Sequence, residues 1–463
     1  MSDVPASSSK KQLKILLSPP MNRTFERKVT VPALNDGGLG YIAAACKKAG
    51  ADVTFFSWNT NMDMETFRNK LLEIRPDVVG LKVFTTMFKE AYQTLRCIRE
   101  AIPDALTLIG GPHPSTSRPS DLFVEFDGLL DFAVAGDGEH GLIELLNQIG
   151  IAGGKPKSPK LSGVPGLIYQ NGDEVCSNKP RLDVELDTLA PVDWTLQEPI
   201  WFGSSHGLDK VSTGALVSDS RGCPGRCGFC MSQIINGARP RHRSLKHLCA
   251  EIEELAHKYG VRVLVFTGNA FLSDVDYVRE LCEWFIKFDT PLEWSCTGSA
   301  FDRNLMDPGL LDLMRRAGCT LIYFGIESGC PEVRKRLCQP IPLDDCTKIV
   351  KLTAKAGIRA GCYFMLGFPD ETMDEMNETI KYAYSLPYSS VHFIICLPLP
   401  GSSSYKAVLE QQGIDRIDWS KYDFAKPDPL PCRASPRQVR RKLFEANMLK
   451  RSRLAQRVYR LIH

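Results

Sequence analysis

The sequence has no long apolar segment and no strong excess of charge. No stretch approaches the roughly 20 apolar residues that a membrane-spanning helix needs, and the first 11 residues are polar, unlike a secretion signal. The net charge of +3 is too small to demand a polyanionic partner. We therefore expect a cytoplasmic protein without a membrane span, whose 16 cysteines are mostly free thiols in a reducing environment.

Short apolar runs alternate with helical patterns through residues 12–150, after a disordered start at 1–11. Strands are predicted at 13–17, 53–56, 78–83, 106–109 and 132–135, and helices at 38–49, 64–74 and 88–101. This α/β alternation is typical of a doubly wound, Rossmann-like parallel sheet, whose ligands bind beyond the carboxyl ends of the strands. The candidate ligand-binding residues at these ends are Ser18, Thr85, Thr86, Gly110, Gly111, Pro112, His113, Gly136, Asp137 and Gly138.

Residues 151–210 follow a looser pattern, and we interpret them as a linker with a surface loop at 153–159 and a small hairpin at 167–169 and 174–176. Strand and helix patterns alternate again through residues 211–400. Six such units are too few for a closed eight-stranded barrel, so we expect a partial, open barrel in which the chemistry lies at the carboxyl ends of the strands.

Residues 401–463 are predicted to form a helical C-terminal region. Residues 433–463 hold ten Lys or Arg residues and one acid, a density that could bind nucleic acid or an anionic membrane surface. Apolar residues recur there at helical spacing: Phe444, Met448, Leu454, Val458 and Leu461. We therefore expect an amphipathic helix that packs this apolar side on the barrel and turns its basic side to solvent.

A cysteine loop directly follows the first strand of the predicted barrel. Cys223, Cys227 and Cys230 are separated by three and then two residues, so their thiols must lie close together. By spacing alone they could hold zinc, with His242 or Cys249 as a fourth ligand, or an iron–sulfur cluster with one iron left open. The loop leaves its strand at the end where parallel barrels place their chemistry.

This spacing, with Phe229 before the last cysteine, resembles the signature of radical S-adenosylmethionine (SAM) enzymes. The resemblance implies that Cys223, Cys227 and Cys230 ligate a 4Fe–4S cluster whose fourth iron chelates SAM. It also implies an external one-electron reductant of the flavodoxin or ferredoxin type, and cleavage of SAM to methionine and a 5'-deoxyadenosyl radical. The partial six-unit barrel is the architecture of the same family.

The resemblance also suggests residues that contact SAM. Glu327 and Ser328 follow the fourth barrel strand, and Gly367 opens a turn that resembles the Gly-Phe-Pro-Gly-Glu-Thr turn near the adenine, with Asp370 in place of the second glycine. Where many relatives carry acidic residues or an arginine, this chain offers other polar groups, so these contacts depart from the family pattern. The full set of expected SAM contacts is Phe229, Thr267, Asn269, Ser299, Glu327, Ser328 and Gly367.

The N-terminal strand ends, taken together, resemble the cobalamin-binding domain that precedes the radical domain in one subgroup of this family. The implied role of residues 18, 85–86, 110–113 and 136–138 is to cradle the corrin ring and its nucleotide tail. The Asp-x-His-x-x-Gly pattern that supplies a histidine to cobalt is absent, so His113 is not assigned as a cobalt ligand.

Three functions are consistent with this combination. The first is a cobalamin-dependent radical SAM methyltransferase that uses methylcobalamin and a 5'-deoxyadenosyl radical to methylate an unreactive carbon or phosphorus of a small-molecule substrate. The second keeps both cofactors but catalyses cyclisation, ring contraction or oxidation. The third is an RNA-modifying methylthiotransferase, which is disfavoured because that class carries three further cysteines in its N-terminal domain, where this sheet has Cys46 and Cys97.

Overall fold

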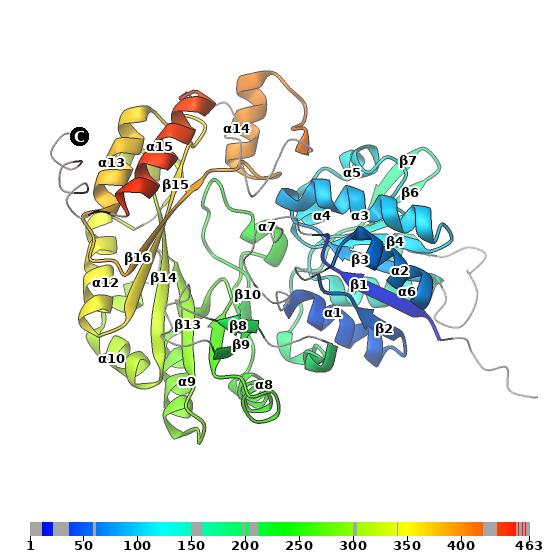
Figure 1. Cartoon of the computed structure of the whole chain (residues 1–463), viewed down its shortest axis with the longest axis horizontal. Helices are drawn as coiled ribbons and strands as arrows, with labels where there is room; N and C mark the ends of the chain where they lie inside the picture. The colour runs from blue at the N-terminus through cyan, green and yellow to red at the C-terminus, as the bar shows by residue number, and fades with distance from the viewer. Residues whose placement is uncertain are drawn as a thin grey trace, which may run out of the picture. The chain divides into compact units, whose positions relative to one another are not determined.

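The computed structural model describes residues 12–21, 37–58, 62–149, 160–196, 200–202, 212–299, 303–339, 341–419, 433–450, 452, 456 and 459. The chain divides into two compact units, each built on one seven-stranded sheet (Figure 1). The first unit comprises Met1–Val184 and Thr188–Glu198, and the second Glu185–Asp187 and Pro199–His463. Within the described residues, no helix is long and apolar enough to cross a membrane.

The first unit has the strand order β2-β1-β3-β4-β5-β6-β7, in which β1 to β5 are parallel. These strands are β1 (Lys14–Ser18), β2 (Asp52–Phe55), β3 (Val78–Lys82), β4 (Leu106–Gly110) and β5 (Phe132–Val134). The main helices are α1 (Gly37–Lys48), α2 (Met64–Ile74), α3 (Phe88–Ala101) and α6 (Gly138–Ile149). One apolar cluster joins α1 and α6 to the sheet, while α2 packs beside α3. The predicted doubly wound sheet is therefore confirmed.

The small hairpin extends this sheet instead of standing alone in a linker. Strand β6 (Leu167–Asn171) pairs antiparallel with β5, and β7 (Glu174–Ser177) pairs antiparallel with β6. Leu167 and Tyr169 are buried in the apolar cluster of the sheet. So short a hairpin does not reveal in its sequence which strand it will join. The predicted surface loop at 153–159 and the start at 1–11 lie outside the described residues, and the domain boundaries stay a prediction.

The second unit has the strand order β16-β15-β14-β13-β12-β9-β8, and all neighbours from β9 to β16 are parallel. The strands are β8 (Ile200–Phe202), β9 (Ser212–Val217), β12 (Val263–Phe266), β13 (Glu293–Ser299), β14 (Cys319–Glu327), β15 (Arg359–Leu366) and β16 (Ser390–Ile395). Between them run α8 (Leu245–Lys258), α9 (Val275–Lys287), α10 (Pro308–Arg316), α12 (Leu343–Lys355) and α13 (Met373–Ala383). The curled sheet confirms the predicted partial barrel (Figure 1).

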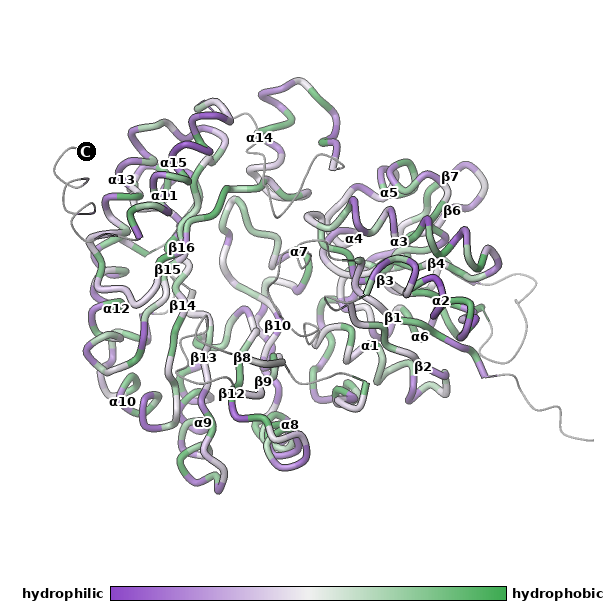
Figure 2. Tube along the Cα trace, viewed as in Figure 1, coloured by the Kyte–Doolittle hydropathy of each residue, from purple (hydrophilic) through white to green (hydrophobic). Residues whose placement is uncertain are grey.

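The strands of both sheets are mostly hydrophobic, whereas the helices carry hydrophobic and hydrophilic residues in alternation (Figure 2). In β14, for example, Ile322, Phe324 and Ile326 are buried, while the intervening Tyr323, Gly325 and Glu327 remain partly exposed. Successive side chains of a strand point to opposite faces of a sheet. One face of β14 therefore packs in the core, and the opposite face carries the partly exposed side chains of Tyr323 and Glu327.

The C-terminal helix packs with a different side from the one predicted. Helix α15 (Pro436–Leu449) lies beside α13 and the sheet (Figure 1), but Phe444 and Met448 are 67% and 43% exposed. The buried side consists of Val439, Lys442, Ala446 and Leu449. The prediction was wrong because the spacing of apolar residues does not show which side of the helix is buried. Lys442 is buried because it forms an ion pair with Glu445 (2.8 Å) and lies over the Tyr459 ring. Leu454, Val458 and Leu461 lie outside the described residues.

Candidate functional site

The cysteine loop begins where β9 ends and is closed at its base by a short antiparallel ribbon of β10 (Ser220–Arg221) and β11 (Arg241–His242). Inside the loop, the Cys223 N–H donates to the Gly237 carbonyl (3.0 Å). Gly222 has φ +93°, and a Cβ there would lie 2.1 Å from the Arg239 carbonyl oxygen, so only glycine fits. The Gly228 N–H donates a hydrogen bond to the Leu337 carbonyl, and the Gly228 carbonyl accepts one from the Ser404 N–H.

The three thiols of this loop suit a cationic group. Cys230 is exposed, and Cys223 and Cys227 are half-buried. Burial, and then the nearby Cys230, Cys223 and Glu327, raise the pKa of Cys227 to about 12, so three thiolates would repel one another without a positive charge between them. The donor set therefore fits an iron–sulfur cluster.

A zinc site finds no support in the same region. Among the described residues, no group of three or more His, Cys, Asp and Glu side chains is arranged to hold a single metal ion. The spare ligands have other surroundings: the His242 ring packs on Tyr277 (4.8 Å between centroids), and Cys249 is buried on α8. The thiols of a cluster each bind a different iron and need not converge on one point.

Glu327 ends β14 in a strained conformation beside the cysteine loop. Its φ of +69° is rare for a residue with a side chain, and the register between β14 and β15 shifts at this point. Burial raises the pKa of Glu327 to about 7, although Arg334 opposes this shift. Strain of this kind persists only where the surrounding structure imposes it, and it concentrates at functional sites.

Ser328, predicted to contact SAM, turns its side chain into the core. Its hydroxyl lies 3.0 Å from Thr379 Oγ1 on α13 and accepts a hydrogen bond from the Cys330 N–H (3.1 Å). Ser328 is fully buried. These contacts use the Ser328 hydroxyl to anchor the Glu327 segment to α13, and a contact of Ser328 with SAM stays a prediction.

The Gly367 turn lies against the cysteine loop through aromatic packing. Phe229 packs on Phe368 (5.9 Å between ring centroids) within a small apolar cluster. Gly367 has φ +84°, and its N–H and that of Phe368 donate to Glu371 Oε2 (2.6 and 3.2 Å). Burial raises the pKa of Glu371 to about 8. Glu371 stands inside this turn but was not among the residues predicted from the sequence.

The polar groups after β12 and β13 are exposed or undescribed. Thr267 and Asn269 are both exposed, and the Thr267 N–H donates to the Val217 carbonyl (2.9 Å). Ser299 ends β13, and its side chain lies outside the described residues. Arg303, the next arginine after β13, forms an ion pair with Asp345 (3.0 Å).

In the first unit, the predicted cobalamin residues follow β1, β3, β4 and β5, which are neighbours in the sheet. The loops after β4 and β5 are joined by a hydrogen bond from the Gly136 N–H to Ser115 Oγ (3.0 Å). Gly111 and Gly136 have φ of +94° and +76°, which other residues rarely adopt. Fold and hydrogen bonding therefore bring these sequence positions to one edge of the sheet.

The side chains of Ser18, Thr85 and His113 face inward at this edge. His113 is fully buried: its Nδ1 lies 3.1 Å from Thr85 Oγ1, and its Nε2 lies 3.6 Å from Glu125 Oε2. The Ser18 hydroxyl donates to the Pro19 carbonyl (2.7 Å). These side chains hold the loops in place, and a contact of the three residues with cobalamin stays a prediction.

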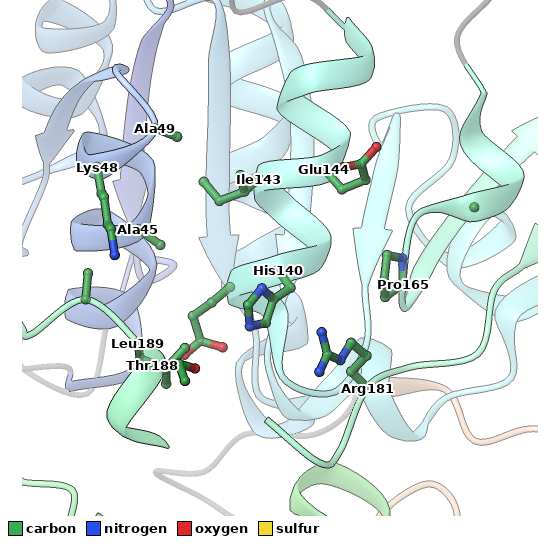
Figure 3. A pocket seen from close by; sticks show the side chains of 13 residues that line it. Ala45, Lys48, Ala49, His140, Ile143, Glu144, Pro165, Arg181, Thr188 and Leu189 are labelled. Carbon is green, nitrogen blue, oxygen red and sulfur yellow. The ribbon is translucent and has the colours of Figure 1, made fainter. Parts of the chain in front are cut away.

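The first unit also contains a cavity of about 570 Å³ that the sequence did not predict. It lies at α1, α6 and the segment around Thr188, and the side chains of Lys48, His140 and Arg181 surround it (Figure 3). None of the residues predicted to bind cobalamin lines this cavity. It is therefore distinct from the loops at the carboxyl edge of the sheet.

A doubly wound sheet followed by a half-barrel with three thiols after its first parallel strand defines a class of enzyme. The Radical SAM superfamily model matches residues 217–383, and the B12 binding domain model matches residues 32–146. The chain therefore contains a Radical SAM domain and a B12-binding domain in one polypeptide. The cofactors expected from the sequence, a 4Fe–4S cluster, SAM and cobalamin, are those of these two domains.

Three curated relatives are each 26% identical to the chain. The uncharacterized methyltransferase PH0819 of Pyrococcus horikoshii aligns over 90% of this chain and 88% of its own length. The cytidylyl-2-hydroxyethylphosphonate methyltransferase of Streptomyces wedmorensis aligns over 87% and 83%. The anaerobic magnesium-protoporphyrin IX monomethyl ester cyclase of Cereibacter sphaeroides aligns over 85% and 63%.

Two solved structures share the fold of the whole chain. The radical SAM methyltransferase TsrM from Kitasatospora setae, solved with cobalamin and a [4Fe-4S] cluster, has a TM-score of 0.68 and 21% identity, covering 93% of this chain and 81% of its own. The radical SAM enzyme OxsB, solved with aqua-cobalamin and SAM, has a TM-score of 0.73 and 16% identity, covering 95% and 67%.

Proposed function

We propose that the protein is a cobalamin-dependent radical SAM methyltransferase that methylates an unreactive carbon or phosphorus atom of a small molecule. The observation that supports this most is that both cofactor domains occur in one chain whose full-length relatives include two proteins named methyltransferases. When bound, the cluster supplies an electron for SAM cleavage and the corrinoid carries the methyl group.

In the half-barrel, Cys223, Cys227 and Cys230 would hold the cluster. Glu327 would accept hydrogen bonds from the amino group of SAM, because its carboxyl lies near enough to Cys227 to raise the pKa of that thiol. With its own pKa near 7, Glu327 is ionised more readily once a cationic ligand is beside it. The backbone at Gly367 would border the adenine, and the exposed Thr267 and Asn269 offer further polar contacts.

In the first unit, the loops at 18, 85–86, 110–113 and 136–138 would cradle the corrinoid. A Cβ on Gly110 would meet only the Val134 carbonyl oxygen, at 3.8 Å, so the rim of β4 leaves room for a ligand. Both ring nitrogens of His113 face protein groups, Thr85 and Glu125. We therefore propose that His113 supplies no ligand to cobalt.

An external one-electron donor of the flavodoxin or ferredoxin type would reduce the cluster. Cys230 is the exposed member of the triad, so the cluster loop reaches the surface of its unit at that residue. A small, acidic donor protein is the kind of partner that meets this requirement.

The test is anaerobic reconstitution of the full chain with iron, sulfide and cobalamin, followed by reductant and SAM that is labelled in its methyl group. We expect corrinoid retained after gel filtration, label transferred to it, and both S-adenosylhomocysteine and 5'-deoxyadenosine among the products. The Cys227→Ala variant should retain corrinoid and lose formation of 5'-deoxyadenosine by about 100-fold or more, because the cluster loses one of its protein ligands. Retained cleavage in this variant would contradict the cluster assignment.

A cyclase or other rearrangement is the second candidate, because the chain also aligns with magnesium-protoporphyrin IX monomethyl ester cyclases from two organisms. This reaction would keep the same cofactor sites but transfer no methyl group. In the experiment above it predicts 5'-deoxyadenosine without S-adenosylhomocysteine.

The RNA-modifying alternative has weaker support. Cys46 and Cys97 lie on helices α1 and α3, not on strands of the sheet, and both are buried. Burial raises the pKa of Cys46 to about 12.

A further inference from the structure

Asp219 is a buried carboxyl group at the base of the cysteine loop, four residues before Cys223. It is fully buried, and its neighbour Ser220 is 3% exposed. Within the described residues, Asp219 Oδ2, His242 Nδ1 and Tyr277 Oη have no hydrogen-bond partner. Burying polar groups in this way costs free energy, so a site that keeps them is expected to serve a purpose beyond packing.

Two hydrogen bonds make Asp219 a link between two parts of the half-barrel. Its carbonyl oxygen accepts from the Arg243 N–H (2.9 Å), which closes the base of the cysteine loop next to the β10–β11 ribbon. Its Oδ1 accepts from the Gly268 N–H (3.0 Å). Gly268 stands between Thr267 and Asn269, the polar residues after β12.

Gly268 fits against Asp219 without room for a side chain. A Cβ on Gly268 would lie 2.2 Å from Ser220 Oγ and 2.5 Å from each carboxylate oxygen of Asp219. Real Cβ atoms do not approach other heavy atoms this closely, so only a glycine lets the turn after β12 pack against the base of the loop. Arg243, in turn, forms an ion pair with Glu251 on α8, which fixes the other end of the contact.

We propose that Asp219 is a positioning residue that sets the turn at Thr267–Asn269 against the root of the cluster loop, so that SAM meets both in one fixed geometry. This inference rests on the proposed placement of SAM at the carboxyl end of the half-barrel, and not on methyl transfer. Asp219 Oδ1 needs only to accept the hydrogen bond from the Gly268 N–H, so the oxygen of an asparagine amide can take its place.

The test is equilibrium dialysis of labelled SAM against the anaerobically reconstituted full chain, together with its iron content. Asp219→Ala should weaken SAM binding by about tenfold, equivalent to about 1.4 kcal/mol, while iron per chain stays at the wild-type value. Asp219→Asn keeps an acceptor for the Gly268 N–H and should restore the dissociation constant to within about threefold of wild type. Gly268→Ala should reproduce the effect of Asp219→Ala from the other side of the contact.

Asp131→Ala is the matched control. Asp131 accepts from the Thr107 N–H (2.8 Å) and pairs with Arg99 (2.9 Å) in the first unit, so its removal should lower the melting temperature without changing SAM affinity. If Asp219→Ala lowers the melting temperature but binds SAM as wild type does, the inference is wrong. A wild-type protein that binds SAM but methylates nothing would contradict the proposed function and leave this inference standing.

Discussion

At the scale of single residues, the half-barrel site concentrates acids in environments that favour the neutral form. Burial is the main cause for Glu327, Glu371 and Asp219 alike. Of these, Glu371 has the clearest structural task, since it accepts from the two backbone N–H groups that shape the Gly367 turn. Its other oxygen, Oε1, has no partner among the described residues.

Glu371 predicts a pH dependence of stability. Its pKa is raised by burial from 4.5 to about 8, so the folded protein binds this proton more tightly than the unfolded chain does. The stabilisation is complete below pH 4.5 and is lost as the pH rises toward 8. Glu371→Gln keeps an acceptor for both N–H groups and removes the titration. We expect the variant to melt higher than wild type at pH 8 and to show a flatter profile between pH 5 and 8.

Glu375, in the first turn of α13, is the control because its pKa shifts the other way. Hydrogen bonds from the Thr372 N–H and from Arg336 hold the pKa of Glu375 below its ordinary value, against the effect of burial. Its stabilisation is present at neutral pH and is lost on acidification. Glu375→Gln should therefore lower the melting temperature at pH 8. Equal pH profiles for wild type and Glu371→Gln would contradict the assignment to Glu371.

At the scale of elements, α15 is fastened to the half-barrel through a narrow contact with the Gly367 turn. A Cβ on Gly367 would lie 2.8 Å from Val439 Cγ1, and the Arg433 N–H donates to the Pro369 carbonyl (2.9 Å). Farther along the helix, the Tyr384 hydroxyl donates to the Ala446 carbonyl (2.5 Å). The helix therefore supports the turn from behind.

This packing predicts opposite outcomes for two apolar residues of α15. Val439 is fully buried, so Val439→Ala should lower the free energy of unfolding by about 1 to 2 kcal/mol through lost burial and a small cavity. Phe444 is 67% exposed, so Phe444→Gln should change it by no more than about 0.5 kcal/mol. Urea denaturation followed by circular dichroism measures both. A larger loss from Phe444→Gln would mean that this residue is covered in solution.

At the scale of the whole molecule, the chain separates its cysteines by task. The three in the loop after β9 are half-buried or exposed, whereas most of the other cysteines that the structure describes are buried as small apolar residues. Burial raises the pKa of Cys46, Cys249, Cys282 and Cys362 to about 12. The pKa of Cys227 is raised to the same value, so enclosure of the whole side chain, and not the pKa, separates the structural cysteines from the cluster cysteines.

This separation predicts the iron content of the reconstituted protein. One cluster amounts to about four iron atoms per chain, and Cys97→Ser, which changes a buried thiol in the first unit, should leave that number unchanged. Cys223→Ala should reduce it strongly. Colorimetric iron and sulfide analysis checks both. About eight iron atoms in the wild type would instead indicate a second cluster and would favour the RNA-modifying alternative.

The sequence alone determined the features that depend on local order along the chain. The spacing of Cys223, Cys227 and Cys230 is itself the chemical signature, and alternating strand and helix patterns are repeated in both sheets because burial imposes a fixed period on each element. The C-terminal ends of α2 and α3 are set by prolines just beyond them, at Pro76 and Pro103.

Only the tertiary structure decided which way side chains face and what lies opposite them. Ser328 stands in a segment that resembles the family motif, yet its hydroxyl lies 3.0 Å from Thr379 Oγ1 on α13. Lys442 is buried and Phe444 exposed, against their polarities, because the contact at Gly367 fixes the orientation of α15. The approach of Asp219 to Gly268 joins residues 49 positions apart. Such contacts depend on how elements pack in space, which no local pattern of residues records.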